Sequence, residues 1–448
     1  MKWRSKVFYL AIALALSLSL VGGATVSANP GSEWWEEWQP EVNGPQWQIA
    51  PNSTIYDFAA DSSGDIIYAV GRGVDEQRTD YSGGMWQESE PKVWKSEDGA
   101  VTWDDITENF PDYFVDYDDS PYFVEIAPDN PDMVFVATSY DVYGSDDGGD
   151  EFGDSGYYDD VDEYINCMAV SCESDDEYTI AVGNDEGEIW RLVTGGFLSG
   201  AWEMIGGYDG DAVLPGWDDT DENGQNSPWV DDTDEVTSVA FSPNFDADDT
   251  ILAITTNDEE TYLQTGRLGN VEQWNYIAGS AFPNAVEIVD TEPEGGRTYT
   301  GIALPADYDG RKDDFRYAWV YVDYDDADLG GDTVGRIFQI ENDVVEYAGL
   351  PCDPEKFTPM LASISAYGTA DEGKLMVGLK GDYDSGDYTE CCEGVDVYYT
   401  TLPIDCCCPD WEKTKKAPTG QRKATVQYVA DGDKAYATTM GVDQGVCD

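Results

Sequence analysis

The chain has 448 residues, of which 92 are acidic and 23 basic, so its net charge is −69. Such a charge repels nucleic acid and anionic lipid, which excludes both as partners, and it attracts cations. Because 41% of the residues are hydrophobic and 13% aromatic, a disordered chain is also excluded.

Residues 1–28 have the pattern of an export signal: basic residues, an apolar run over 7–21 and a small-residue cleavage site at 26–28. The apolar run is short for a membrane span. Cleavage would remove three basic residues and no acidic one, leaving 20 basic against 92 acidic residues and a net charge of −72. We therefore predict an extracellular or cell-surface location, without a membrane span after cleavage.

Residues 29–51 form a Trp-rich lead-in whose Pro and Gly residues disfavour a long helix. Its last part, PQWQIAP, is a candidate closing strand. Residues 52–448 then alternate between short β-rich runs and turn clusters, with almost no helical periodicity. An acidic insert over 211–235 and a Cys-rich hairpin over 381–412 interrupt this rhythm.

The β-rich runs group into seven units of roughly 40–65 residues, each with up to four short strands. AVEIV, at 285–289, is read as the first strand of the fifth unit, and the seventh unit supplies only two strands. Since a single four-stranded sheet cannot bury both faces, the units must stack on one another. We predict an all-β β-propeller of seven blades, with the last blade incomplete or closed by the N-terminal strand.

Two loops share a pattern that suits a tight hairpin. SEDGAVTW contains Ser96, Asp98, Gly99 and Trp103, and SDDGGDEF contains Ser145, Asp147, Gly149 and Phe152. The carboxylate can accept hydrogen bonds from turn amides, glycine allows a positive φ, and the aromatic ring packs back onto the sheet. A third, degenerate copy includes Asp185, Gly187 and Trp190.

These loops resemble the Asp-box, or BNR, repeat, S-x-D-x-G-x-x-W, although Ala100, Phe152 and Gly183 depart from it. The resemblance implies a propeller in which the repeat is structural, at the outer turn of a blade. The family includes sialidases, xyloglucan-type glycoside hydrolases, sortilin-like receptors, a photosystem assembly factor and cell-surface proteins. The sequence disfavours a sialidase, because no arginine motif of the sialidase type occurs near the start and the negative charge would repel an anionic sugar.

The acidic insert contains the start of a calcium loop, D-x-[DN]-x-[DN]-G, at Asp219, Asp221 and Asn223. The twelfth position is Val230 instead of Glu, and no flanking helices are indicated, so this is not an EF-hand. A bound Ca²⁺ and a chance match in an acidic chain both explain the pattern. Asp307–Gly310 and Asp382–Gly386 are weaker versions.

Cysteines are odd in number, at nine, and the chain has no histidine. Export favours disulfide formation. A zinc site is disfavoured because the C-x-x-C spacing of zinc modules is missing. The sequence does not determine the connectivity. The disulfide candidates are Cys167, Cys172, Cys391, Cys392, Cys406, Cys407 and Cys408.

No Gly-rich phosphate loop or Ser/His/Asp set is present. The sequence therefore favours a non-catalytic structural or binding component of a prokaryotic cell surface, such as a surface layer, whose partners are the envelope, a second copy, a glycan or a protein. A secreted glycoside hydrolase with paired carboxylates is the alternative. A third alternative is an assembly-factor or receptor-like propeller that binds a protein.

Overall fold

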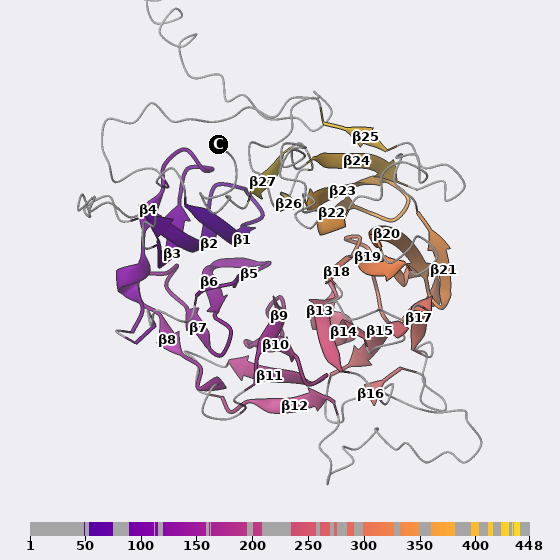
Figure 1. Ribbon diagram of the computed structural model, residues 1–448. Helices are drawn as coiled ribbons and strands as arrows, with labels where there is room; N and C mark the ends of the chain where they lie inside the picture. The colour runs from indigo at the N-terminus through magenta and orange to yellow at the C-terminus, as the bar shows by residue number, and fades with distance from the viewer. Residues whose placement is uncertain are drawn as a thin grey trace, which may run out of the picture.

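The structure is a computed structural model of the chain. It describes residues 49, 53–74, 89–111, 113–114, 120–157, 161, 163–194, 200–207, 234–256, 260–268, 273–275, 285–290, 299–326, 332–348, 360–380, 396–402, 411–414, 423–429, 432 and 434–439. The described strands form seven antiparallel sheets around a central axis (Figure 1). We number these sheets as blades 1 to 7 in chain order.

Blades 1 to 3 each have four strands, in the order of the chain. Blade 1 contains β1 (Thr54–Ala60), β2 (Ile67–Val74), β3 (Ser89–Ser96) and β4 (Asp104–Asp105). Blade 2 contains β5 (Phe123–Ala127), β6 (Asn130–Ala137), β7 (Val142–Ser145) and β8 (Gly153–Asp154). Blade 3 contains β9 (Ile165–Val170), β10 (Tyr178–Asn184), β11 (Ile189–Thr194) and β12 (Glu203–Gly206).

Blades 4 to 6 continue the pattern, and blade 7 is smaller. Blade 4 contains β13 (Glu235–Phe241), β14 (Thr250–Thr256), β15 (Glu260–Arg267), β16 (Gln273–Trp274) and β17 (Val286–Asp290). Blade 5 contains β18 (Tyr299–Ala303), β19 (Tyr317–Asp326), β20 (Asp332–Glu341) and β21 (Val344–Tyr347). Blade 6 contains β22 (Met360–Gly368), β23 (Gly373–Lys380), β24 (Val397–Leu402) and β25 (Glu412–Lys413), and blade 7 contains β26 (Ala424–Tyr428) and β27 (Ala435–Thr439).

Helical structure is limited to short turns in the part of the chain that the structure describes. They include η2 (Thr107–Asn109), α3 (Phe245–Asp248) and η3 (Asp313–Phe315). Among these residues, no helix reaches the length and hydrophobicity that crossing a membrane requires.

The prediction of an all-β propeller is confirmed, and the blade count differs in detail. Within the described residues six blades are complete, not seven, and the seventh sheet has the two strands read from the sequence. The assignment of AVEIV to the fifth unit is wrong. β17 instead pairs with the first half of β15, where the two-residue β16 leaves the edge of that strand open.

Hydrophobic side chains fill the interfaces between blades. Seven clusters of buried residues each join two neighbouring blades, and the cluster between blades 7 and 1 closes the ring. Second strands are therefore covered on both faces, and every residue of β10 and β14 is buried. This explains why each strand has an unbroken apolar run, Ile180–Val182 in β10 and Ile251–Ile254 in β14, instead of alternating apolar and polar residues.

Side-chain hydrogen bonds reinforce the closure between the first and last blades. The Gln427 side chain accepts from Ala60 N at 2.8 Å and donates to Ala60 O at 3.1 Å, while Tyr436 donates to Gly64 O at 2.8 Å. The candidate closing strand lies outside the described residues except for Ile49. This residue packs against the blade 7–blade 1 cluster, which includes Val429 and Trp94.

Candidate ligand-binding face

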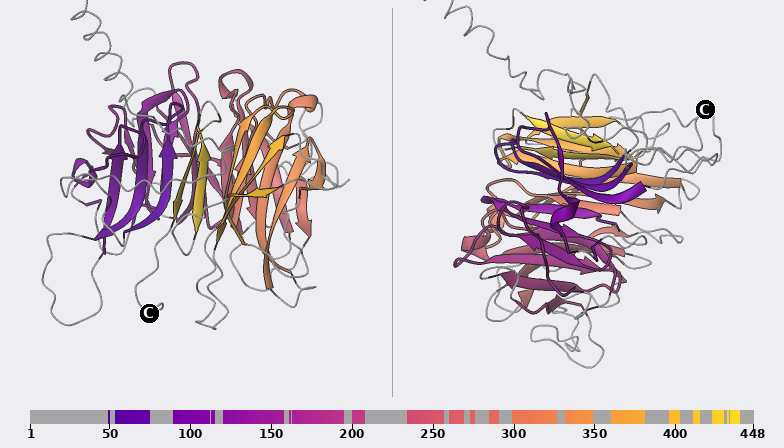
Figure 2. Two further views of the ribbon diagram at one scale, coloured as in Figure 1. Left: turned by 90° about the horizontal axis from the view of Figure 1, so that it is seen from above. Right: turned by 90° about the vertical axis from the view of Figure 1, so that its left-hand side faces the viewer.

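The strands run roughly along the axis of the propeller, so its turns gather at two ends (Figure 2). In each blade the first strand lies nearest the axis (Figure 1). These inner strands begin at the same end, as contacts between their N-terminal halves indicate: Val124 N donates to Asp57, and Thr237 and Thr300 share a hydrogen bond of 2.7 Å. We call this end the start face and the opposite end the clasp face.

Two carboxyl groups lie on adjacent inner strands at the start face. Asp57 of β1 and Glu125 of β5 are both half-buried, and the Asp57 carboxylate accepts a hydrogen bond of 3.2 Å from Val124 N. Burial raises the pKa of Asp57 to about 6, although the Lys423 charge opposes this. Burial also raises the pKa of Glu125 to about 8, with the Asp57 charge acting in the same direction. At neutral pH Glu125 therefore holds its proton while Asp57 is largely ionised.

Two lysines accompany these carboxyl groups. Lys423 and Lys380 form an isolated antiparallel β-bridge between blades 7 and 6. Burial lowers the pKa of Lys423, which Asp57 counteracts and Lys380 reinforces. The Lys380 ammonium lies 4.0 Å from the ring centroid of Tyr299. Acidic, basic and aromatic groups thus meet near the axis.

Asp323 of β19 joins blade 5 to blade 6 in the way that Asp57 joins blade 1 to blade 2. Its carboxylate accepts from Leu361 N at 2.8 and 3.1 Å, and Leu361, like Val124, is the second residue of an inner strand. Only 1% of Asp323 is exposed, and burial raises its pKa to about 8. This inaccessible carboxyl group is suited to holding blades together.

Exposed tyrosines stand where inner strands begin. Tyr122 immediately precedes β5, Tyr164 precedes β9, and Tyr299 is the first residue of β18. Their exposed fractions are 36%, 46% and 50%. We did not single out these residues, Asp57, Glu125 or Lys423 from the sequence. A tyrosine at the start of the first strand in three units was the available signal.

The two Ser-x-Asp loops lie on the clasp face, between the third and fourth strands of blades 1 and 2. In the first, Ser96 accepts from Ala100 N, and Asp98 accepts from Thr102 N at 2.7 Å. In the second, Ser145 accepts from Gly149 N, and Asp147 accepts from the amides of residues 150 and 151. Gly99 has a φ of 71°. Phe152 is buried and Trp103 half-buried, each against its own blade interface.

The expected third copy is not equivalent to these loops. Asp185 and Gly187 lie between the second and third strands of blade 3, on the start face, and Trp190 lies within β11. Asp185 accepts from Tyr164 N at 3.2 Å, so its carboxylate supports a different turn. The sequence similarity was misleading because Gly183 pairs with Ile189 across the hairpin of β10 and β11, whereas the two Ser-x-Asp loops follow the third strand of a blade.

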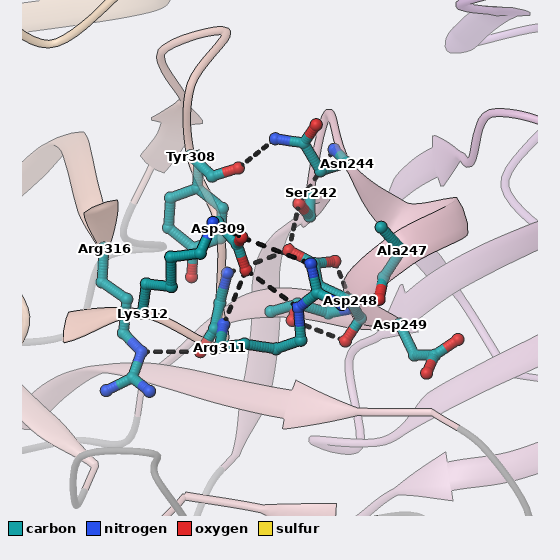
Figure 3. A network of polar contacts seen from close by, with 12 residues as sticks. Ser242, Asn244, Ala247, Asp248, Asp249, Tyr308, Asp309, Arg311, Lys312 and Arg316 are labelled. Carbon is teal, nitrogen blue, oxygen red and sulfur yellow. Dashed lines mark hydrogen bonds and ion pairs between the residues drawn. The ribbon is translucent and has the colours of Figure 1, made fainter. Parts of the chain in front are cut away.

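The structure does not test the calcium prediction. Asp219, Asp221 and Asn223 lie outside the described residues, as does Asp382–Gly386. In the weaker candidate loop Asp307–Gly310, Asp309 forms ion pairs with Arg311 at 3.1 Å and Lys312 at 2.7 Å (Figure 3). The hydrogen bond from Arg311 holds the pKa of Asp309 well below its usual range. Two cations already satisfy this carboxylate, and no group of three metal-binding side chains occurs among the described residues.

The described cysteines depart from the disulfide prediction. Cys167 and Cys172 are free thiols. Cys167 lies within β9 and Cys172 beyond its end, so the two Cα atoms are on the order of 15 Å apart, too far for a bond between them. Burial raises the pKa of Cys167 to about 12. Cys391, Cys392, Cys406, Cys407 and Cys408 lie outside the described residues.

Among known proteins, matches to this chain were found only by comparison of structures. No protein-family model and no curated protein matches the chain. An ancestral GH74 enzyme is similar at 13% identity and a TM-score of 0.45, over 88% of this chain and 48% of that one. This chain therefore spans about half the length of the GH74 enzyme. YCF48 bound to D1 peptide is similar at 11% identity and a TM-score of 0.47, over 90% and 96% of the two chains.

Proposed function

We propose that this protein is a non-catalytic, ligand-binding β-propeller of a prokaryotic cell surface, and that it binds its ligand at the start face. The observation that carries this proposal is the group of Asp57, Glu125, Lys380, Lys423 and exposed tyrosines on or beside the inner strands at one end of the propeller. The clasp face is instead occupied by hydrogen bonds that hold its own turns. The leader-like start and the acidity of the chain support export.

The Ser-x-Asp loops support kinship with Asp-box propellers, in a structural role. Their side chains bond to backbone within the same turn. Calcium at Asp219, Asp221 and Asn223 remains a prediction. A melting temperature that is the same in chelator and in millimolar calcium would contradict it.

A glycoside hydrolase is the second candidate, and the pKa difference between Glu125 and Asp57 favours it. A protonated carboxylic acid beside an ionised one is the arrangement that glycoside hydrolysis uses. Against this, Asp57 already accepts a backbone hydrogen bond and lies beside the Lys423 charge. Both interactions stabilise the ionised Asp57 as a fixed structural group and weaken it as a nucleophile.

Two measurements test the proposed function. Immunogold electron microscopy of purified envelopes should locate the protein at the cell surface. Reducing-sugar release from a panel of neutral glycans should equal the blank for both the wild type and Glu125→Gln. Release by the wild type that is lost in Glu125→Gln would establish the hydrolase instead, and protein confined to the cytoplasm would overturn the surface role.

A further inference from the structure

The Lys423 side chain lies at the start of the inner strand of blade 7 without a bonding partner. It forms no hydrogen bond or ion pair with another described residue, although the Asp57 charge acts on it. Lys423 is half-buried, and solvent still reaches its Nζ. By contrast, ion pairs with carboxylates occur at Lys92, Lys95 and Lys312. Since enclosed ammonium groups are normally paired, the unpaired Lys423 suits a role other than holding the fold.

Neighbouring strands of blades 6 and 7 fix the position of Lys423. It immediately precedes β26, and it forms the antiparallel bridge with Lys380, the last residue of β23. The Ser363 hydroxyl holds the next residue by donating to Ala424 O at 2.8 Å. Directly opposed residues of an antiparallel pair carry their side chains on one face, with Cβ atoms about 4.5–5.5 Å apart. The two lysine side chains therefore begin side by side.

The two lysines differ in their surroundings. The Lys380 ammonium lies 4.0 Å from the centroid of the Tyr299 ring, a contact that attracts a cation. Lys423 has no aromatic contact of this kind among the described residues. Burial lowers the pKa of Lys423, the Asp57 charge opposes this, and the Lys380 charge reinforces it. Lys423 therefore loses its proton more readily than an isolated lysine and becomes a nucleophilic amine.

Other acidic residues of the start face lie farther from the axis or in a distant blade. Glu90, Asp185 and Glu260 belong to the second and third strands or to the turns between them, outside the inner strands (Figure 1). Glu235 begins β13 in blade 4, on the other side of the ring from blade 7. The charges that act on Lys423 are those of Asp57 and Lys380.

We infer that the start face captures a small aldehyde as a reversible imine on Lys423. The Lys423 nitrogen forms a bond to the carbonyl carbon, the C–O bond breaks, and the oxygen leaves as water with the two protons of the amine. Amine and aldehyde thus give imine and water, with no oxidant or reductant. Hydrolysis releases the aldehyde unchanged, so this step is covalent binding and not turnover. The inference rests on the proposed function, because it names the ligand of the same face.

The test is reductive trapping of the imine in the full chain. Benzaldehyde and sodium cyanoborohydride are added at pH 7, and peptide mass spectrometry follows the benzylation of each lysine. We expect Lys423 to be benzylated faster than Lys312, whose side chain is 59% exposed but ion-paired with Asp309. Lys380→Met should slow benzylation of Lys423 about three- to tenfold, because it removes a neighbouring positive charge. Lys374→Met, the matched control from the same strand, should leave the rate unchanged.

The outcomes separate this inference from the proposed function. The imine site is wrong if Lys423 is benzylated no faster than Lys312, a comparison within the wild type that needs no variant to fold. Equal slowing by Lys380→Met and Lys374→Met, in variants with unchanged circular dichroism and melting temperature, would also overturn it. In either case the proposed function stands if immunogold labelling places the protein at the cell surface. Protein confined to the cytoplasm would overturn the proposed function whatever the benzylation shows.

Discussion

Aspartate side chains experience opposite environments at the two ends of the propeller. Burial opposes ionisation of Asp98 and Asp147, but hydrogen bonds from nearby hydroxyl and amide groups more than compensate and lower both pKa values. At the start face, burial dominates and raises the pKa values of Asp57 and Asp323. The same residue type thus supports turns at one end and joins blades at the other.

Asp323 makes stability depend on pH. Its pKa rises from 3.8 to about 8 on folding, so the folded state binds the proton more tightly. This stabilisation is fully present below pH 3.8 and is lost as pH rises through about 8. We expect the urea midpoint of the wild type to fall between pH 5 and pH 8.5 by more than that of Asp323→Asn, which does not titrate. The prediction fails if both proteins show the same pH dependence.

Ala100 offers a test of backbone strain. It has a φ of 68°, where the second loop has Gly149 at 88°. Because left-handed backbone is unfavourable for alanine, Ala100→Gly should raise the free energy of unfolding by about 0.5–1 kcal/mol. Gly149→Ala should lower it, since the added Cβ would lie 3.3 Å from both Ile106 and Tyr68. Chemical denaturation measures both, and destabilisation by Ala100→Gly would refute the strain argument.

Strand elements depend on their place in the ring as much as on their composition. In blades 1 and 3, an apolar residue at or just after the outer strand packs into the interface with the next blade: Ile106 in one case and Ile205 in the other. Ile49 occupies the corresponding interface between blades 7 and 1. The segment before β1 therefore contributes to joining the two ends of the chain.

We expect Ile49→Asp to destabilise the fold by about 1–3 kcal/mol, because it places a charge against an apolar cluster. Val344→Asp is the matched control, as Val344 is 52% exposed on β21, and its effect should stay within about 0.5 kcal/mol. Urea denaturation followed by tryptophan fluorescence gives both values. Equal effects would show that Ile49 has no special role.

The whole molecule is a closed ring without a covalent bond between its first and last blades in the described residues. The Gln427 amide bridges residues 367 positions apart, joining blade 7 to blade 1. Loss of such a link need not disturb distant blades, because each blade packs only against its neighbours.

Gln427→Ala should therefore lower the free energy of unfolding by about 1–2 kcal/mol and increase amide exchange mainly in β1, β26 and β27. Gln264→Ala is the matched control, since Gln264 bonds to Thr255 and Asn275 within blade 4. Its increase in exchange should be confined to that blade. Hydrogen-exchange mass spectrometry distinguishes the two, and the same exchange pattern in both variants would contradict a role in closure.

Sequence reasoning succeeded where the interactions are local. The second strands were recognisable because β10 and β14 contain unbroken apolar runs, and the Ser96–Asp98 and Ser145–Asp147 hydrogen bonds join residues only two positions apart. It failed at Asp185, where similar letters occupy another turn, and at β17, which pairs back to β15. In both cases strand pairing decided the outcome, and pairing is set by the whole sheet.

The sequence alone determined that this chain folds as stacked β-sheets with two Ser-x-Asp hairpins, since strand periodicity and turn hydrogen bonds depend on adjacent residues. Only the tertiary structure decided which side chains meet at the start face. Asp57 accepts a hydrogen bond from Val124, 67 residues away in the chain. The Lys423 charge affects the pKa of Asp57 only because the ring closes. Burial, and with it the pKa of each carboxyl group, arises from blades that lie far apart in the chain.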